Sequence, residues 1–370
     1  MSYDAELREK TNEARKRFGM ALSLATPTET FASARESFRM RCDFKVWHDG
    51  ARSFFAMCDS DAPKEIVEVR DFPMAHARIR ELMPRVIEEV EKRELVRKKL
   101  FQANFLTATT GDCVLSLLYH RQLDGAWERE ADAMRRALGI DVIGRARNQK
   151  FVYAKDFVTE RVRVEGFEKL VSYKQLEGSF TQPNAGVAAQ MLAWARSAAV
   201  CDDPNGVVAP TTSDFLELYC GNGHFTIALA PLFRKCLATE MAKSSVSAAL
   251  ENMRANGVDN IVVARLSAEE LSDALDGGRA YKRLKEVDLS TYDMRTILVD
   301  PPRAGMGERV STFCSRFDRV VYISCNPETM ARDCEILCQT HDIKRFAVFD
   351  QFPYTPHLET GVLLVKKSII

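Results

Sequence analysis

The sequence has 370 residues, which is enough for two domains that each bury a core. Apolar residues make up 46% and charged residues 28%, and the 52 lysines and arginines balance the 52 aspartates and glutamates. This composition excludes collagen-like, low-complexity and intrinsically disordered chains. The neutral total charge gives no sign of a polyanion-binding protein as a whole, although a neutral total can contain a local basic face.

The first ten residues contain Asp4 and Glu6 and lack the apolar stretch of a signal peptide, and no run is long enough to cross a bilayer. The ten cysteines are therefore expected to be reduced thiols. No C-x2-C pair occurs, which disfavours zinc and iron–sulfur sites. We expect a cytoplasmic protein with no metal, no membrane contact and no obligate protein partner.

The first part of the chain predicts helices mixed with hairpins. Residues 1–30 predict a charged amphipathic helix that ends near Thr26-Pro27. Residues 38–47 alternate apolar and polar side chains, which predicts a half-buried strand, and Asp49-Gly50 then predicts a hairpin turn.

Further along, residues 74–99 predict a helix interrupted at Pro84, and residues 100–109 and 113–120 predict a second hairpin. A short helix is expected over residues 126–138. Strands mixed with helices indicate an α+β domain, which we place at residues 31–178 after the N-terminal helical segment 1–30.

From Phe180 onward, apolar strands alternate with helices, beginning with a helix at about 183–199. The expected strands are 214–219, 235–240, 261–266, 296–300, 320–324, 346–350 and 361–365. Such alternation predicts a parallel, doubly wound α/β sheet, so residues 179–370 are expected to form a Rossmann-like domain. Within it, Ser267 and Glu270 predict a capping box at a helix start.

One strand-to-helix turn has the pattern of a cofactor loop. In L-E-L-Y-C-G-N-G-H-F, Gly221 and Gly223 allow a ligand to approach the backbone, and the next helix offers free N–H groups. Glu240 ends the following strand, where a carboxylate typically binds ribose hydroxyls. The third glycine of the dinucleotide fingerprint is missing, which favours S-adenosylmethionine over NAD. A plain turn followed by an exposed glutamate is the alternative.

A cysteine occupies the end of another predicted strand, in V-V-Y-I-S-C-N-P-E-T-M. Cys325 lies at the carboxyl end, where open α/β sheets bind ligands. Asn326 is a good N-cap and Pro327 suits the first helical position, so the thiol is expected beside a helix N-terminus that favours thiolate. That context suits a nucleophile, but a buried inert cysteine fits equally well. Met330, Cys334, Leu337 and Cys338 recur at helical spacing, which predicts a buried stripe rather than a metal site.

Basic and aromatic residues gather in the first domain. Arg39, Arg41, Lys45 and Trp47 are predicted on one face of a strand, basic residues of 93–99 lead into Phe101 and Phe105, and Arg145, Arg147 and Lys150 form a third group. Each group alone is more often a solvated face. Together they favour a surface that binds RNA phosphates and exposed bases.

Several motifs in this order resemble the RNA uracil-5-methyltransferases. They are L-E-L-Y-C-G-N-G at 216–223, V-D-P-P-R-A-G at 299–305, Y-I-S-C-N-P-E-T at 322–329 and D-Q-F-P-Y-T-P-H-L-E at 350–359. S-F-T-Q-P-N at 179–184 and R-M-R-C-D-F-K-V-W-H-D-G at 39–50 are similar to the branch that forms ribothymidine in the T-loop of tRNA. The ribosomal-RNA enzymes of the family carry an additional N-terminal barrel and an iron–sulfur cysteine cluster, and neither pattern is present.

The resemblance implies an S-adenosylmethionine-dependent enzyme that acts on the tRNA T-arm, and on the similar arm of tmRNA. It implies that Cys325 is the nucleophile and Glu359 the base that removes the C5 proton; without it, Glu359 would be read as a surface acid before the last strand. The implied cofactor contacts are Gln182, Tyr219, Gly221, His224, Glu240 and Asp300. The family often has asparagine at the position of His224.

Three other functions stay open at this point. An RNA-holding protein with a vestigial site would not need Cys325, Asp300 and Glu359 together. D-P-P at 300–302 resembles amino-group methyltransferases, but Arg303 stands where they carry an aromatic residue. Cytosine-5 enzymes have proline before the nucleophile, and here Ser324 precedes Cys325.

Overall fold

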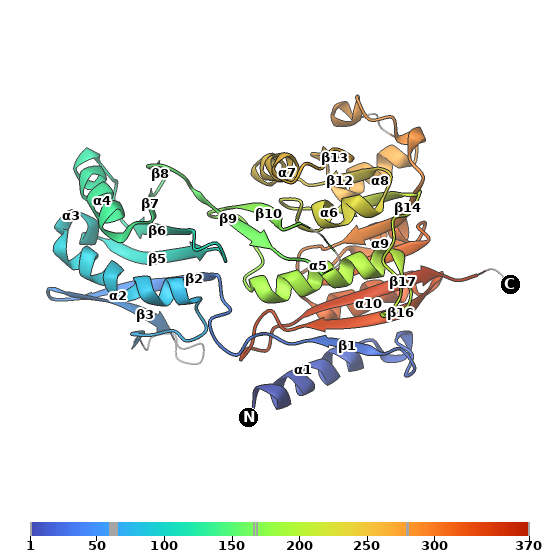
Figure 1. The fold of residues 1–370 in the computed structure, drawn as a ribbon, viewed down its shortest axis with the longest axis horizontal. Helices are drawn as coiled ribbons and strands as arrows, with labels where there is room; N and C mark the ends of the chain where they lie inside the picture. Colours follow the sequence, from blue (N-terminus) through green and yellow to red (C-terminus); the bar gives the residue numbers. More distant parts are fainter. Residues whose placement is uncertain (1, 59–65, 166, 168, 279–280, 369–370) are drawn as a thin grey trace. The chain divides into compact units, whose positions relative to one another are not determined.

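The computed structural model describes residues 2–58, 66–165, 167, 169–278 and 281–368 (Figure 1). Contacts divide the chain into two compact units. The first comprises Met1–Ser33, Val162–Tyr173 and Gly186–Ile370, and the second Ala34–Arg161 and Lys174–Ala185. This division differs from the ranges 1–30, 31–178 and 179–370, because the N-terminal residues join the unit that contains the C-terminus. Among the described residues, none of the helices is long and apolar enough to cross a membrane.

An eight-stranded sheet organises the first unit, with strand order β1-β16-β17-β15-β14-β11-β12-β13. The strands are β1 Thr28–Phe31, β11 Asp214–Leu218, β12 Cys236–Thr239, β13 Ile261–Ala264, β14 Met294–Val299, β15 Arg319–Ser324, β16 His341–Phe349 and β17 Glu359–Lys366. The doubly wound sheet is confirmed, with one correction: β17 runs antiparallel to both neighbours. No helix separates β16 from β17, so the chain turns back directly instead of crossing over the sheet.

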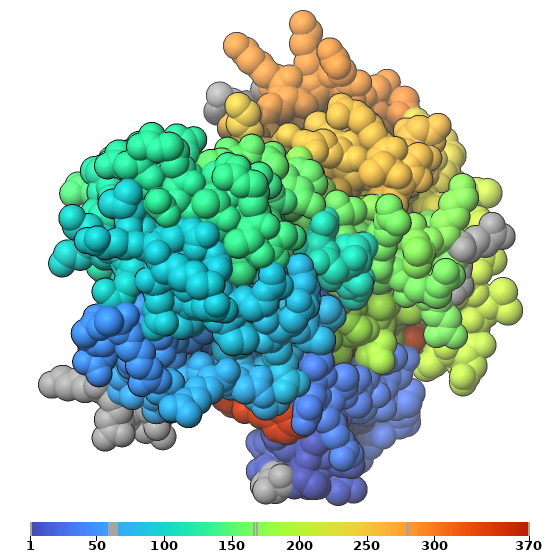
Figure 2. All heavy atoms as spheres, turned by 60° about the vertical axis from the view of Figure 1, so that its left-hand side comes forward, coloured from blue at the N-terminus to red at the C-terminus, as the bar shows by residue number. Residues whose placement is uncertain are grey.

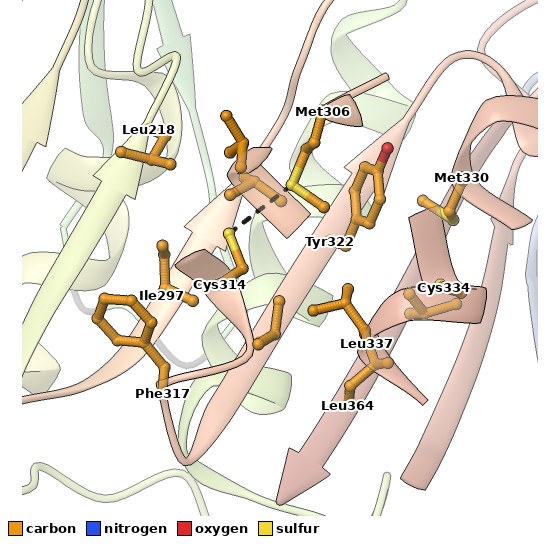
Figure 3. Packing of buried hydrophobic residues seen from close by; sticks show 14 of the residues in the cluster. Leu218, Ile297, Met306, Cys314, Phe317, Tyr322, Met330, Cys334, Leu337 and Leu364 are labelled. Carbon is orange, nitrogen blue, oxygen red and sulfur yellow. Dashed lines mark hydrogen bonds between the residues drawn. The ribbon is translucent and has the colours of Figure 1, made fainter. Parts of the chain in front are cut away.

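Helices cover both faces of this sheet (Figure 1). They are α1 Tyr3–Arg17, α5 Ala185–Val200, α6 His224–Leu229, α7 Lys243–Asn256, α8 Ala268–Leu275, α9 Gly307–Cys314 and α10 Pro327–Leu337, with 3-10 turns at Gly19–Ala21, Ala230–Leu232, Lys282–Leu284 and Leu289–Thr291. Adjacent residues of β14 point to opposite faces of the sheet and belong to different cores. Ile297 packs with residues of α1, α9 and α10, and Leu298 packs with residues of α5 and α6. Figure 3 shows the first of these cores, where Met330, Cys334 and Leu337 of the predicted stripe are fully buried. Cys338, the fourth residue of that stripe, is only half-buried at the edge of the core.

The N-terminal helix is shorter than predicted. α1 ends at Arg17, and Gly19 follows with a φ of 49°, a left-handed conformation that commonly terminates helices. The chain then forms β1, which pairs in parallel with β16. Residues 28–31 therefore belong to the large sheet. The predicted capping box of α8 is confirmed, since Ser267 Oγ accepts from the Glu270 N–H at 3.1 Å and Glu270 Oε2 accepts from the Ser267 N–H at 3.0 Å.

A seven-stranded sheet forms the second unit, in the order β4-β3-β2-β5-β6-β7-β8. Its strands are β2 Arg41–Asp49, β3 Arg52–Cys58, β4 Ile66–Glu68, β5 Leu100–Thr107, β6 Cys113–Tyr119, β7 Asp141–Ala146 and β8 Gln149–Val152. Both predicted hairpins are confirmed, as is the alternation in β2, where Cys42, Phe44 and Val46 are buried. Two further strands, β9 Phe157–Val162 and β10 Val171–Leu176, form a separate pair.

The helices of the second unit are α2 Ala77–Lys92, α3 Glu94–Arg97 and α4 Gly125–Leu138, whose residues are coloured light blue to green in Figure 2. The predicted interruption at Pro84 is wrong, because α2 continues through this residue. Pro84 lies on the exposed side, where water can solvate the Arg80 carbonyl that loses its helical partner. Ile79, Leu82 and Val86 remain buried on the opposite face and hold the helix in place.

Candidate active site

Several loops converge at one edge of the large sheet. In the parallel registers, Leu218 lies beside both Thr239 and Val299, and Val299 lies beside Tyr322. The residues that follow these strands therefore emerge at the same edge. Tyr219, Glu240 and Asp300 are among them, as predicted for a ligand site at the carboxyl ends of strands.

The antiparallel strand β17 brings Glu359 to the same edge. Ser324 of β15 pairs with Thr360 of β17, and the Thr360 hydroxyl donates to the Ser324 carbonyl at 3.2 Å. Cys325 directly follows Ser324 and Glu359 directly precedes Thr360, so the two lie side by side. Glu359 is buried, with 4% of its surface exposed. The register thus brings together the two residues to which the family resemblance gives catalytic roles.

Local hydrogen bonds fix the backbone next to the thiol. Asn326 caps α10 as predicted, since Asn326 Oδ1 accepts from the Glu328 N–H at 3.2 Å and Pro327 occupies the first helical position. The Asn326 N–H donates to Ser324 Oγ at 3.0 Å, and Asn326 Nδ2 donates to the Arg303 carbonyl at 3.0 Å. The backbone next to Cys325 is therefore tied to the loop that follows Asp300.

The expectation that the helix N-terminus favours a thiolate at Cys325 is wrong, because the surroundings of the sulfur raise the thiol pKa. Burial, followed by the nearby carboxyl groups of Glu359 and Asp300, raises the pKa of Cys325 to about 11. Arg303 acts in the opposite direction but does not compensate. Burial and the nearby carboxylates outweigh the helix N-terminus, because both disfavour the negatively charged thiolate.

Asp300 and Glu359 influence one another. Burial raises the pKa of Asp300 to about 7, and burial together with the Asp300 charge raises the pKa of Glu359 well above its usual value. Two carboxyl groups this close resist being ionised together. Near neutral pH the pair therefore retains a proton, which leaves one of the two able to act as an acid.

The glycine loop has the strained geometry of a ligand cradle. Tyr219, Gly221 and Gly223 have positive φ angles of 61°, 55° and 82°. A Cβ on Gly223 would lie 3.1 Å from Ile227 Cδ1, so glycine suits this position on both counts. Glu240 lies behind the loop, where its Oε2 accepts from the Gly221 N–H at 3.1 Å. The loop, the carboxylate and the start of α6 thus lie together at this edge of the sheet.

Two polar side chains near this loop are largely withdrawn from solvent: His224 is half-buried with a buried Nε2, and Glu217 is fully buried. His224 begins α6, burial lowers its pKa to about 4, and its Nε2 has no hydrogen-bond partner among the described residues. Glu217 lies within β11, accepts from the Thr226 hydroxyl at 2.5 Å, and has a pKa raised to about 8 by burial and by Asp300 and Glu240. Sequence reasoning missed Glu217, although a charged residue inside an apolar strand indicated it.

A cavity of about 580 Å³ opens beside Cys325. It is lined by Glu6, Glu9, Lys10, Glu13, Ala14 and Arg17 of α1, by Arg303 and residues 325–328, and by residues 354–358. The cavity is large enough for a small planar ring. No pattern in the sequence indicated that the N-terminal helix forms part of this wall.

The remaining predicted residues lie in the second unit. Gln182 is half-buried in the segment between β10 and α5. Lys45 and Arg147 are exposed, and 46% of Trp47 is exposed. All three side chains therefore lie at the surface of this unit.

Three predicted RNA-binding arginines already contact their own unit. Arg39 Nε donates to the Arg41 carbonyl at 2.9 Å, Arg41 Nη1 donates to the Ser179 carbonyl at 2.7 Å, and Arg145 Nη2 pairs with Glu177 Oε2 at 2.5 Å. Phe105 is fully buried, with its ring centroid 5.8 Å from that of Phe55. Its prediction as an RNA contact is wrong, because it belongs to the core of the sheet.

The site agrees with what sequence and structure comparisons find. A family model described as tRNA (Uracil-5-)-methyltransferase matches residues 2–367. The tRNA/tmRNA (uracil-C(5))-methyltransferase of Shewanella amazonensis is 47% identical over 343 residues, covering 92% of this chain and 91% of that protein. Its counterpart from an Azoarcus species is 47% identical over 366 residues, covering 99% and 97%.

Among solved structures, the Pyrococcus abyssi tRNA (uracil-54, C5)-methyltransferase in complex with S-adenosyl-L-homocysteine superposes with a TM-score of 0.72 at 21% identity. The match covers 99% of this chain and 84% of that one, which shows a common fold. The family match spans nearly all of this chain and includes the thiol, the carboxyl group and the glycine loop. The chain belongs to the tRNA (uracil-5-)-methyltransferase family.

Proposed function

We propose that this protein transfers a methyl group from S-adenosylmethionine to C5 of uridine 54 in the T-loop of tRNA, giving 5-methyluridine. The observation that carries this proposal is the strand register that sets Cys325 beside Glu359. A thiol and a carboxyl group at one ligand-binding edge fit a reaction that needs a nucleophile and a base. Uracil-5-methylation of tRNA is the activity of the family to which the chain belongs.

The residues at the glycine loop fit S-adenosylmethionine. His224 Nε2, which has no hydrogen-bond partner among the described residues, suits a polar group of a nucleoside. Glu240 lies where ribose hydroxyls are expected. When bound, the cofactor supplies the methyl group on a positively charged sulfur. We assign its contacts to Gln182, Tyr219, Gly221, His224, Glu240 and Asp300.

Covalent catalysis overcomes the weak nucleophilicity of uracil C5. Cys325 first loses its thiol proton to solvent, and its Sγ then forms a bond to C6 while the electron pair of the C5–C6 double bond shifts toward C5, which becomes enolate-like. After C5 has accepted the methyl group, Glu359 removes the remaining C5 proton. The electrons of that C–H bond restore the double bond, the C6–S bond breaks and the thiolate is released.

The electrostatics of the site suit this order of events. Thiolate formation is costly while Glu359 and Asp300 both carry charge, because each raises the pKa of Cys325. The proton that this carboxyl pair retains lowers its negative charge and so makes thiolate formation less costly. Arg303 also lowers the pKa of Cys325. Glu359 must then lose its proton before it can act as the base toward C5.

The second unit offers a surface for the RNA. Exposed Lys45 and Arg147 can contact phosphates, and Trp47 can stack on a base. The target uridine must leave its stack to reach the cavity beside Cys325. We include the T-arm-like loop of tmRNA as a substrate, because relatives that are 47% identical are named for both RNAs.

The proposal is tested with a T-arm RNA that carries tritium at C5 of the target uridine. Incubation with methyl-labelled S-adenosylmethionine should release one tritium for each methyl group incorporated. Cys325→Ala should abolish methyl incorporation and tritium release. Cys201→Ala removes a half-buried thiol that donates a hydrogen bond to the Val207 carbonyl, and this variant should retain both activities. Methyl incorporation without tritium release would place the methyl group elsewhere, and RNA binding without any methylation would leave only an RNA-holding function.

A further inference from the structure

Lys10 of α1 links the N-terminal helix to the loop that precedes Glu359. Its Nζ donates to Asp350 Oδ1 at 2.9 Å, to the Phe352 carbonyl at 3.2 Å and to the Thr355 carbonyl at 2.8 Å. The ammonium thus uses all three of its donors on one loop. Only 10% of the Lys10 side chain and none of the Asp350 side chain is exposed, while Glu6 lies 3.5 Å away on the same helix.

This loop, residues 350–358, connects β16 to β17 and forms part of the cavity wall. Residues 354–358 line the cavity beside Cys325, and the next residue is Glu359. Tyr354 has a φ of 64°, a left-handed conformation that is unfavourable for a residue with a side chain. The two carbonyls that Lys10 binds, at residues 352 and 355, lie on either side of Tyr354. Lys10 therefore holds both ends of a strained turn.

The helix that carries Lys10 is fixed independently of this contact. Tyr3, Leu7, Ala14 and Phe18 of the N-terminal segment are buried in the core of the first unit. The Phe18 ring also meets the Phe346 ring of β16 edge to face, with centroids 5.1 Å apart. α1 is therefore a firm support, and Lys10 is a polar link from that support to the loop.

We propose that Lys10 is a positioning residue for methyl transfer, which holds loop 350–358 in the shape that receives the target base. This inference rests on the proposed function. Without the ammonium, the strained turn at Tyr354 can relax and the wall of the cavity is lost. Capture of the base by Cys325 should then become slow, whereas overall RNA affinity, which we assign to Lys45, Trp47 and Arg147, should persist.

The test compares Lys10→Met with Lys16→Met. Lys16 lies on the same helix but is 71% exposed and pairs only with Glu13 among the contacts described. The assay follows the covalent adduct formed with S-adenosylmethionine and a T-arm RNA that carries 5-fluorouridine at the target position, at saturating RNA. Lys10→Met should slow adduct formation by about tenfold or more, because small displacements in an active site carry large kinetic costs. RNA affinity should be nearly unchanged, and Lys16→Met should match the wild type in both.

A second variant is needed because Lys10→Met leaves the Asp350 carboxylate buried without its ammonium partner and can therefore unfold the protein. Lys10→Met combined with Asp350→Asn removes both charges but still lacks the bonds to the two carbonyls, so it should fold and remain slow. Lys10→Arg, which keeps the positive charge and several donors, should recover part of the rate. A folded double variant with the wild-type adduct rate would overturn this inference alone, whereas a wild-type protein that forms no adduct would overturn the proposed function as well.

Discussion

At Cys325, nearby charges act on the sulfur in opposite directions. Glu359 and Asp300 raise the pKa of the thiol, and Arg303 lowers it. The local sequence correctly predicted the strand, the N-cap and the helix start around this cysteine. It could not predict the ionisation state, because the two carboxyl groups come from other strands and reach the sulfur only in the folded protein.

The first prediction concerns the pH dependence of Cys325 alkylation. Because the thiol pKa is raised to about 11, thiolate is scarce at neutral pH, and the reaction with iodoacetamide should accelerate as the pH rises toward that value. At a pH high enough for both carboxyl groups to be ionised, Glu359→Gln removes a charge that raises the pKa of Cys325, so alkylation there should become about tenfold faster if that pKa falls by about one unit. Arg303→Gln should have the opposite effect. Mass spectrometry of the Cys325 peptide measures the rate, and slower alkylation of Glu359→Gln would contradict the electrostatic assignment.

The second prediction concerns the release step. Glu359→Gln removes the base, so the methylated ring should keep its C5 proton and stay bonded to Cys325. A denaturing gel should show methylated RNA attached to this variant, while turnover falls by roughly a hundredfold or more. Glu328→Gln, an exposed acid that lines the same cavity, should turn over normally. Normal release of product by Glu359→Gln would remove Glu359 from this role.

Phe105 and Glu217 show what single positions do not reveal. Phe105 follows a run of basic residues, which suggested RNA, yet in β5 it points into the core with Phe44 and Phe55. Phe44 and Phe55 determine the environment of Phe105 in the folded sheet, and both are distant from it in sequence. Glu217 is the reverse case, since a carboxyl group in an apolar strand could have been recognised as unusual from sequence alone.

At the scale of elements, α10 holds the loop that follows Asp300. Asp333 Oδ2 accepts from the Met306 N–H at 2.7 Å and from the Tyr322 hydroxyl at 2.9 Å, while Thr329 donates to the Arg303 carbonyl at 3.2 Å. Gly305 lies at the closest approach, because a Cβ there would be 2.6 Å from Asp333 Oδ2. The helix that begins just after Cys325 and the Asp300 loop therefore form one support.

The third prediction tests this packing with a matched pair of glycines. Gly305 and Gly307 both have positive φ, 78° and 72°, but a Cβ on Gly307 would meet no atom within 4 Å. Both alanine variants bear the cost of a left-handed residue, and only Gly305→Ala also crowds Asp333. Gly305→Ala should therefore be less stable than Gly307→Ala by about 1–3 kcal/mol in urea unfolding. Equal stabilities would show that α10 and the loop are not tightly packed.

Helix and strand patterns predicted most elements, but not how their ends are placed. The alternation of β2, both hairpins and the capping box of α8 followed from local rules. The continuation of α2 through Pro84 depended on which side of the helix faced water. β17 runs antiparallel because the loop before it contains no crossover helix. Sequence periodicity does not indicate whether a strand runs parallel or antiparallel to its neighbours.

At the scale of the whole molecule, we assign different tasks to the two units. The thiol, the carboxyl pair and the glycine loop belong to the first unit, and the exposed Lys45, Trp47 and Arg147 belong to the second. The sequence predicted two domains, because regular alternation of apolar strands with helices begins near Phe180. It did not predict that residues 1–33 join the first unit, because that depends on the pairing of β1 with the distant strand β16.

The fourth prediction follows from this division. Lys45→Ala and Trp47→Ala should each weaken T-arm RNA binding by roughly tenfold, because they remove a phosphate contact or a stacking surface. The affinity for S-adenosylmethionine should not change. Lys344→Ala, which alters an exposed cation of the first unit, serves as the control. Calorimetry with each ligand measures both affinities, and a shared loss of cofactor affinity would contradict the assignment of tasks.

The central claim is that Cys325 bonds to C6 of the target uracil while C5 accepts the methyl group. The most direct measurement is mass spectrometry of proteolysed wild-type protein after reaction with S-adenosylmethionine and the 5-fluorouridine T-arm RNA. We predict a methylated fluorouracil nucleotide attached to the peptide that contains Cys325, and no such species in Cys325→Ala. Attachment at another residue, or undiminished methylation of unmodified RNA by Cys325→Ala, would contradict the account.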